Sequence, residues 1–247
     1  MIAREAGLLI AAAAFLTRLP LRRSYSEEEL RRCARYFPLV GAGVGAAGAA
    51  VLLGAAAVLP LAIAVILSVI TSVLVTGALH EDGLADSCDA FGGGTTREEV
   101  LRIMQDPHIG AFGALGLGLV LTLKIVALTQ LPLAVLPLAL ICAHASSRAL
   151  CVAVMWLGEY ARHEGGRTRA VARGVRASDA AVALVIGLAP FSLAPAAFLR
   201  AIPAMLVAAI ALYAYFRARI GGYTGDCLGA VQQTAEATCY VTLVAAL

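Results

Sequence analysis

Long apolar stretches, separated by short polar connections, run through most of the chain. The stretches 39–59, 61–79 and 180–199 contain no charged residue, and each approaches the ~20 residues needed to cross the hydrocarbon core of a bilayer. Three other stretches, 111–131, 133–157 and 227–247, each carry a single Asp, Glu, Lys or Arg. A further stretch, 201–216, is shorter. This pattern predicts an all-α, polytopic integral membrane helix bundle of about seven transmembrane helices.

Shorter helices are predicted outside these stretches. The first apolar run, 6–17, is too short to span, so we expect an N-terminal interfacial or re-entrant helix whose sidedness stays open. Ser26 and Thr96 each precede acidic residues, as an N-cap precedes a first helical turn. Helices are therefore expected from these caps to about Tyr36 and about Gln105.

The positions of arginine indicate which face is cytoplasmic. Short connections at Pro60, Pro132 and Pro203 fold neighbouring stretches into hairpins, so the longer connections share one face. The basic residues on that face are Arg18, Arg22, Arg23, Arg31, Arg32, Arg35, Arg97, Arg102, Arg162, Arg167, Arg169, Arg173, Arg176, Arg217 and Arg219. Arg200 alone lies on the opposite face. The positive-inside rule then predicts that the basic face is cytoplasmic.

Composition agrees with a membrane protein. Of the 247 residues, 61% are hydrophobic and 14% charged, whereas soluble domains are about 25% charged. We expect one catalytic domain over 1–247 within a lipid bilayer, and no nucleic-acid partner, because basic and aromatic residues are not interleaved. Six cysteines without a C-x-x-C pair argue against disulfides and zinc. Gly41, Gly45 and Gly48 permit close helix packing, within one chain or between copies in a homo-oligomer.

The stretch from His80 to Gly94 follows an apolar segment and is rich in acids. Asp82, Asp86 and Asp89 are four and three residues apart, so on a helix they share one face, with about 5–6 Å between neighbouring side chains. Carboxylates this close repel one another unless a cation lies between them, and oxygen ligands favour Mg²⁺ or Ca²⁺. We therefore predict a divalent-cation site rather than a solvated acidic loop.

Other polar residues of this face are candidate partners of the cation or of a phosphate. His80 is a candidate general base, metal neighbour or interfacial residue. A glycine run would let the backbone approach a phosphate, and a rigid turn at Pro107 can hold side chains against the acidic helix. These further candidates are Gly92, Gly93, Gly94, Asp106, His108 and Asp226.

Three charged residues lie inside apolar stretches, where each costs about 2.5–3.5 kcal/mol on insertion scales. Arg148 and Glu236 both lie about 15 Å from the cytoplasmic side and can meet, with Arg148 binding phosphate or pairing with Glu236. Lys124, the only lysine, lies about 20 Å from the cytoplasmic side. It either has a function there or extends its ammonium group to the far interface, as snorkelling lysines do. A cation transporter would also explain such charges, but transporters place carboxylates near the midplane, whereas nearly all acids here lie at one face.

With these residues identified, the chain resembles the cobalamin synthase family, the adenosylcobinamide-GDP ribazoletransferases, nearly from end to end. The matching motifs are FLTRLP at 15–20, YFPLVG at 36–41, HEDGLAD at 80–86 with Asp89, RIMQD at 102–106, IGAFG at 109–113 and GGYTGDCLGA at 221–230. Two features depart from the family pattern: Glu81, where members often have an apolar residue, and the loop at Gly165-Gly166-Arg167. Neither is assigned catalysis from the resemblance.

The resemblance implies Mg²⁺-dependent transfer of a phosphocobinamide group from adenosylcobinamide-GDP, a corrinoid nucleotide, to α-ribazole or its 5′-phosphate, releasing GMP. It implies a bacterial cytoplasmic membrane enzyme whose active site faces the cytoplasm. His80 is then the leading general base and His108 the reserve. The implied metal residues are Asp82, Asp86 and Asp89, with Asp106 and Asp226 as additional ligands or supporting groups. The glycine run and the charges inside apolar stretches, rather than the resemblance, give the predicted substrate-binding residues, which are Gly92, Gly93, Lys124, Arg148 and Glu236.

A CDP-alcohol phosphatidyltransferase is the alternative enzyme class. Asp82, Gly83 and Ala85, followed by further acids, are similar to that family's Asp-Gly-x-x-Ala-Arg signature. Asp86 follows Ala85 in place of its arginine, however, one residue closer than in the signature, and Leu79 stands in place of its first aspartate. These mismatches argue against that class.

Overall fold

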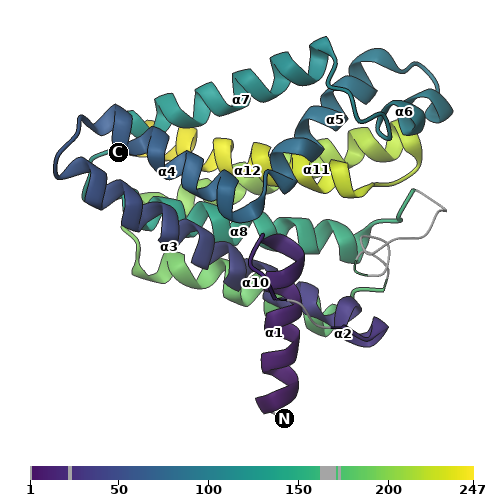
Figure 1. Ribbon diagram of the computed structural model, residues 1–247, viewed down its shortest axis with the longest axis horizontal. Coiled ribbons are helices and arrows are strands. Elements are labelled where there is room, and N and C mark those ends of the chain that lie inside the picture. Colours follow the sequence, from purple (N-terminus) through teal and green to yellow (C-terminus); the bar gives the residue numbers. More distant parts are fainter. Residues whose placement is uncertain (1, 22–23, 162–170, 172–173) are drawn as a thin grey trace.

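A computed structural model describes residues 2–21, 24–161, 171 and 174–247 of the chain (Figure 1). The loop at Gly165-Gly166-Arg167 and the arginines at 22, 23, 162, 167, 169 and 173 lie outside these residues. The helices are α1 (Ile2–Leu16), α2 (Glu27–Arg32), η1 (Cys33–Tyr36), α3 (Phe37–Ala56), α4 (Leu61–Thr76), α5 (Leu79–Gly93), α6 (Arg97–Ile103), α7 (Ala111–Gln130), α8 (Leu136–Leu157), α10 (Ala177–Leu188), η2 (Ala189–Leu193), η3 (Ala196–Arg200), α11 (Ala201–Ile220) and α12 (Gly225–Ala246).

The all-α membrane bundle is confirmed, whereas the expected number of about seven spans stays a prediction. In the described residues four helical segments are long and apolar enough to cross a membrane, and a fifth counts if α4 and α5, bent by 90°, form one span. The four segments are Glu27–Ala56, Ala111–Gln130, Leu136–Leu157 and Ala196–Ile220. Helix α12 is absent from this set, because polar residues lower its hydropathy, yet it packs against α5, α7, α8 and α11.

One expected span, 61–79, ends in a sharp turn, and another, 180–199, is broken. Gly77 and Ala78 both have left-handed backbones, with φ of 65° and 60°, and this turn ends α4 and starts α5 in a new direction. The expected span at 180–199 becomes the 12-residue helix α10 followed by two 3₁₀ turns. Pro190 and Pro195 explain that break, because proline lacks the N–H that a continuing α-helix requires.

The short helices form where the capping residues place them. Ser26 and Thr96 each cap a helix in a capping box, with Glu29 and Glu99 as the reciprocal acids. Helix α1 runs across the direction of α3, α7 and α8 and lies against α2, η1 and α3 (Figure 1). This direction fits the expected interfacial helix.

The small residues of α3 pack against α8 within the chain. A Cβ atom at Gly41 would lie 2.3 Å from the carbonyl oxygen of His144, and one at Gly45 would lie 2.7 Å from that of Leu140. These glycines therefore allow the two backbones to touch. The predicted small-residue packing thus joins two helices of the same chain and says nothing about a homo-oligomer.

Candidate active site

A cavity of about 110 Å³ lies at the end of the bundle where α1, α3, α5, α8 and α12 meet. Its charged or ionisable polar side chains are His80, Asp82, Arg148 and Asp226, and most of the remaining lining is apolar. Three of these residues come from the predicted acidic and C-terminal motifs, and Arg148 comes from within an apolar helix. The structure therefore brings four predicted site residues to one cavity.

Glycines at the crossing of α5 and α12 bring these side chains together. A Cβ atom at Gly83 would lie 3.0 Å from the Cα atom of Asp226, and one at Gly229 would lie 2.8 Å from the carbonyl oxygen of His80. Only residues without a side chain allow so close an approach. The Thr224 hydroxyl accepts a hydrogen bond of 3.3 Å from the backbone N–H of Cys227, which caps the first turn of α12 and fixes Asp226 beside the cavity.

Asp89 is turned toward a different partner. Its carboxylate accepts hydrogen bonds from the backbone N–H groups of Gly110, at 2.7 Å, and Gly113, at 2.8 Å. It therefore satisfies unpaired donors at the start of α7, where a negative charge is also favoured by the helix dipole. This capping role was not predicted from the sequence.

The three predicted metal ligands of α5 do share one helix, but they do not form a ready cluster. Asp82 lines the cavity, whereas Asp86 and Asp89 are absent from its lining. In the described part of the chain, no three His, Cys, Asp or Glu side chains are grouped so that they could hold a metal ion. The metal assignment of Asp82, Asp86 and Asp89 stays a prediction.

Asp106 and His108 lie in the exposed loop before α7 and contact each other. His108 Nδ1 is 2.7 Å from Asp106 Oδ1, and the His108 backbone N–H donates to the same oxygen. The hydrogen bond from the His108 side chain is the main cause of a lowered pKa of Asp106. Neither residue lines the cavity, and His108, with 88% of its side chain exposed, is poorly placed to be a base there.

The glycines at the end of α5 also lie away from the cavity. A Cβ atom at Gly92 would lie 2.5 Å from the ring of Phe112, and one at Gly93 would contact Ile103. Gly92 therefore permits close packing of α5 against α7. The predicted approach of this backbone to a phosphate stays a prediction.

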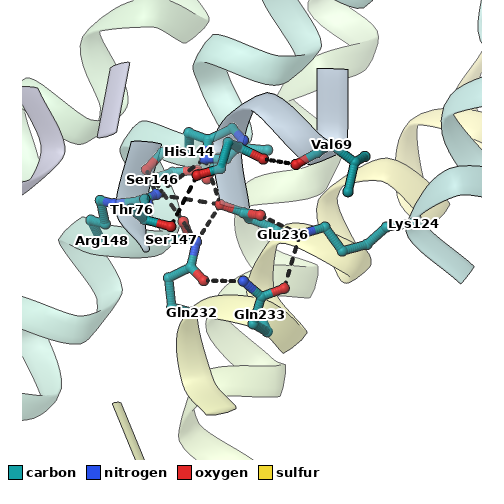
Figure 2. A network of polar contacts seen from close by, with 12 residues as sticks. Val69, Thr76, Lys124, His144, Ser146, Ser147, Arg148, Gln232, Gln233 and Glu236 are labelled. Atoms are coloured by element: carbon teal, nitrogen blue, oxygen red, sulfur yellow. Dashed lines mark hydrogen bonds and ion pairs between the residues drawn. The ribbon is translucent and has the colours of Figure 1, made fainter. Parts of the chain in front are cut away.

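A network of buried polar side chains surrounds Glu236 on α12 (Figure 2). Lys124 Nζ on α7 donates to Glu236 Oε2 at 2.6 Å and to Gln233 Oε1 at 2.9 Å. On α8, His144 Nδ1 and Arg148 Nη1 lie 2.8 Å and 3.3 Å from Glu236 Oε1. The predicted meeting of Arg148 and Glu236 is confirmed, and Lys124, 3% exposed, pairs inside the bundle instead of snorkelling.

Four members of this network were not singled out as site residues from the sequence. Gln232 donates to Glu236, and Gln233 donates to Glu81 Oε1 at 2.7 Å. His144 also contacts the Arg148 guanidinium. A helical signal was present, because the pairs His144 with Arg148 and Gln232 with Glu236 are each four residues apart and so share one face of an apolar helix.

The chain matches the family described as cobalamin-5-phosphate synthase over residues 8–244. Proteins named adenosylcobinamide-GDP ribazoletransferase are similar to it along almost their whole length. The relative from Leptothrix cholodnii is 44% identical, and the match covers 96% of this chain and 94% of the relative. The relative from Shewanella frigidimarina is 40% identical, with 98% of this chain and 95% of the relative covered. The relative from Ralstonia nicotianae is 44% identical, with 91% of this chain and 90% of the relative covered. No solved structure matches. On this evidence, the chain belongs to the cobalamin-5-phosphate synthase family.

Proposed function

We propose that the protein transfers the phosphocobinamide group of adenosylcobinamide-GDP to a hydroxyl of α-ribazole or of its 5′-phosphate, and releases GMP. The family and the names of the relatives support this reaction. The observation that carries it is the cavity lined by His80, Asp82, Arg148 and Asp226, which combines a base with groups of both charges. Transfer of a phosphoryl group needs such groups, because negative charge must be held while a hydroxyl proton is removed.

The size of the cavity limits what it holds. Pockets that enclose a whole drug-sized ligand measure about 300–1,000 Å³, whereas this cavity measures about 110 Å³. A corrinoid nucleotide is larger than such ligands. The cavity is therefore suited to the reacting phosphates and the attacking hydroxyl, with the corrin ring and the base outside it.

The cavity faces the cytoplasm in this proposal, and the protein lies in the bacterial cytoplasmic membrane. Arginines from several connections gather at the same end of the bundle as the cavity. Arg97 donates to the carbonyl oxygens of Ala161 and Ile220, and Arg219 donates to that of Gly94. Retention of arginine-rich loops on the cytoplasmic side supports this orientation. Nucleotide substrates are available on that side.

A magnesium ion fits the acidic residues of the cavity. Mg²⁺ usually takes one or two carboxylates and completes its shell with water and substrate phosphates. Asp82 and Asp226 supply two carboxylates on one cavity wall, where the Gly83 contact brings α5 against α12. These two residues would hold the ion, with Asp86 as a further candidate. When bound, it would neutralise charge on the diphosphate and on the leaving GMP.

Residues of the protein accept the proton that the attacking hydroxyl loses and keep the reactants away from water. His80, which is buried and lines the cavity, takes the proton of the attacking ribose hydroxyl. The hydroxyl oxygen forms a bond to the phosphorus attached to cobinamide, and the phosphoanhydride bond to GMP breaks with its electrons leaving on GMP. The apolar side chains around His80 limit access of water, which would otherwise hydrolyse the nucleotide.

The test is GMP release by the purified protein in liposomes, with adenosylcobinamide-GDP and α-ribazole 5′-phosphate. We expect His80→Ala to lower the rate by ~10²–10⁴, and Asp82→Asn and Asp226→Asn to raise the Mg²⁺ concentration needed for half-maximal rate. Glu98→Gln is the matched control, because the Glu98 side chain is exposed on α6 and lies outside the cavity lining; it should behave like wild type. Absence of GMP release with either acceptor, or Mg²⁺ flux into the liposomes instead, would refute the proposal.

A further inference from the structure

Arg148 is held along only one side of its guanidinium group. Its Nη1 atom makes the contacts to the carbonyl oxygen of His144, at 2.9 Å, to His144 Nδ1 and to Glu236 Oε1. In the described part of the chain, its Nε atom is buried without a hydrogen-bond partner. The residue is 2% exposed and lines the cavity. A buried N–H donor without a partner is costly, and its occurrence in a residue that lines a cavity points to a ligand.

The charge of Arg148 is also incompletely balanced by its protein partner. Glu236 carries one negative charge, and Lys124 lies closer to it, at 2.6 Å, than Arg148 does, at 3.3 Å. The other carboxylate of this network, Glu81, accepts from Gln233, and within the described residues it makes no ion pair. Two cations thus share one carboxylate, and a second anion beside Arg148 would be favoured.

We propose that Arg148 binds a phosphate of the nucleotide diphosphate through its Nε–Nη2 edge, and that Glu236 positions the guanidinium by holding Nη1. This inference rests on the proposed function, because it assigns the diphosphate of that substrate to the cavity. Arginine presents two parallel N–H donors along this edge, which match two phosphate oxygens. Asp82 and Asp226 line the same cavity, so the cation that they would hold and the arginine contact the diphosphate together.

Inorganic pyrophosphate is the probe for this site, titrated calorimetrically into the purified protein in detergent with Mg²⁺ present. Arg148→Lys keeps the positive charge and removes the two-donor edge. Loss of charge-assisted hydrogen bonds of this kind should weaken pyrophosphate binding roughly 10- to 100-fold, and KM for adenosylcobinamide-GDP should rise. Arg35→Lys is the matched control, because Arg35 is also buried but pairs with Asp179 and does not line the cavity; its binding should equal that of wild type.

A second measurement uses only wild-type protein and decides the matter if the Arg148 variant does not fold. Phenylglyoxal modifies arginines, and mass spectrometry reports the adduct at each one. Pyrophosphate should slow the adduct at Arg148 and leave that at the exposed Arg4 unchanged. Equal pyrophosphate affinity in Arg148→Lys, no adduct at Arg148 in the absence of pyrophosphate, or no protection of Arg148 in wild type would overturn the inference.

The two proposals can fail separately. Pyrophosphate binding that depends on Arg148, without GMP release from adenosylcobinamide-GDP, would refute the proposed function and keep the anion site. GMP release with an unchanged KM and unchanged pyrophosphate binding in Arg148→Lys would keep the function and refute the anion site.

Discussion

Breaking the buried ion pair between Lys124 and Glu236 should destabilise the fold. A double-mutant cycle should show energetic coupling between these two residues. Lys124→Met replaces the ammonium by an apolar group of similar length. Glu236 then keeps Arg148, His144 and Gln232 as partners, so we expect a loss at the lower end of the 3–5 kcal/mol typical for breaking a buried pair, about 3 kcal/mol. Glu236→Gln leaves both cations without an anion and should cost about 5 kcal/mol.

The double variant separates pairing from independent contributions. It removes the anion and one cation together, so its loss should fall below the sum of the single losses by about 0.5–3 kcal/mol. The assay is unfolding of the purified proteins in mixed detergent micelles, followed by circular dichroism. Leu123→Met is the matched control, because Leu123 is the neighbouring residue on α7 and is 47% exposed; it should leave stability unchanged. Additivity of the two single losses within about 0.5 kcal/mol would refute the pairing.

Three further predictions concern the elements around the cavity. Gly41→Ala should cost about 1–3 kcal/mol of stability, because its Cβ would press on α8, whereas Gly43→Ala, with no atom within 4 Å, should be tolerated. Asp89→Asn should cost about 0.5–2 kcal/mol through weaker capping of α7; loss of activity at unchanged thermal stability would contradict this. Hydrogen bonds from Thr95 lower the pKa of Glu99 to about 2, so its stabilisation should disappear as pH falls from about 4.5 toward 2. Unfolding temperatures at pH 6 and 3 should therefore differ less in Glu99→Gln than in wild type.

The elements that the sequence predicted correctly depend on local interactions. The caps at Ser26 and Thr96 bond to groups three residues away, so the sequence alone contains both partners. The break between α4 and α5 could not be read in this way. It requires Ala78 to adopt a left-handed backbone, which alanine rarely does without support from surrounding structure. The sequence alone therefore did not show where these helices bend or stop early.

The sequence predicted the positions of site residues relative to one another only where those residues lie on the same helix. Helical spacing placed Asp82 and Asp89 on α5, but it could not show that Asp89 bonds to Gly110 and Gly113, 21 and 24 residues further on. The cost of burying charge correctly predicted that Glu236 would have a partner. The sequence could not show that Lys124 is one of these partners. That contact depends on the packing of α7 against α12, which brings together residues 112 positions apart.

The buried network and the cavity share Arg148, and this shared residue links stability to catalysis. Helices α7, α8 and α12 each contribute a charged side chain to the contacts around Glu236, and α5 joins through Glu81 and Gln233. Three of these helices, α5, α8 and α12, also line the cavity. A substitution in the network therefore changes both the packing of these helices and the direction of the arginine in the cavity. Rates of network variants consequently have meaning only per molecule of folded protein, and a variant that keeps its unfolding free energy but raises KM identifies positioning rather than folding as the cause.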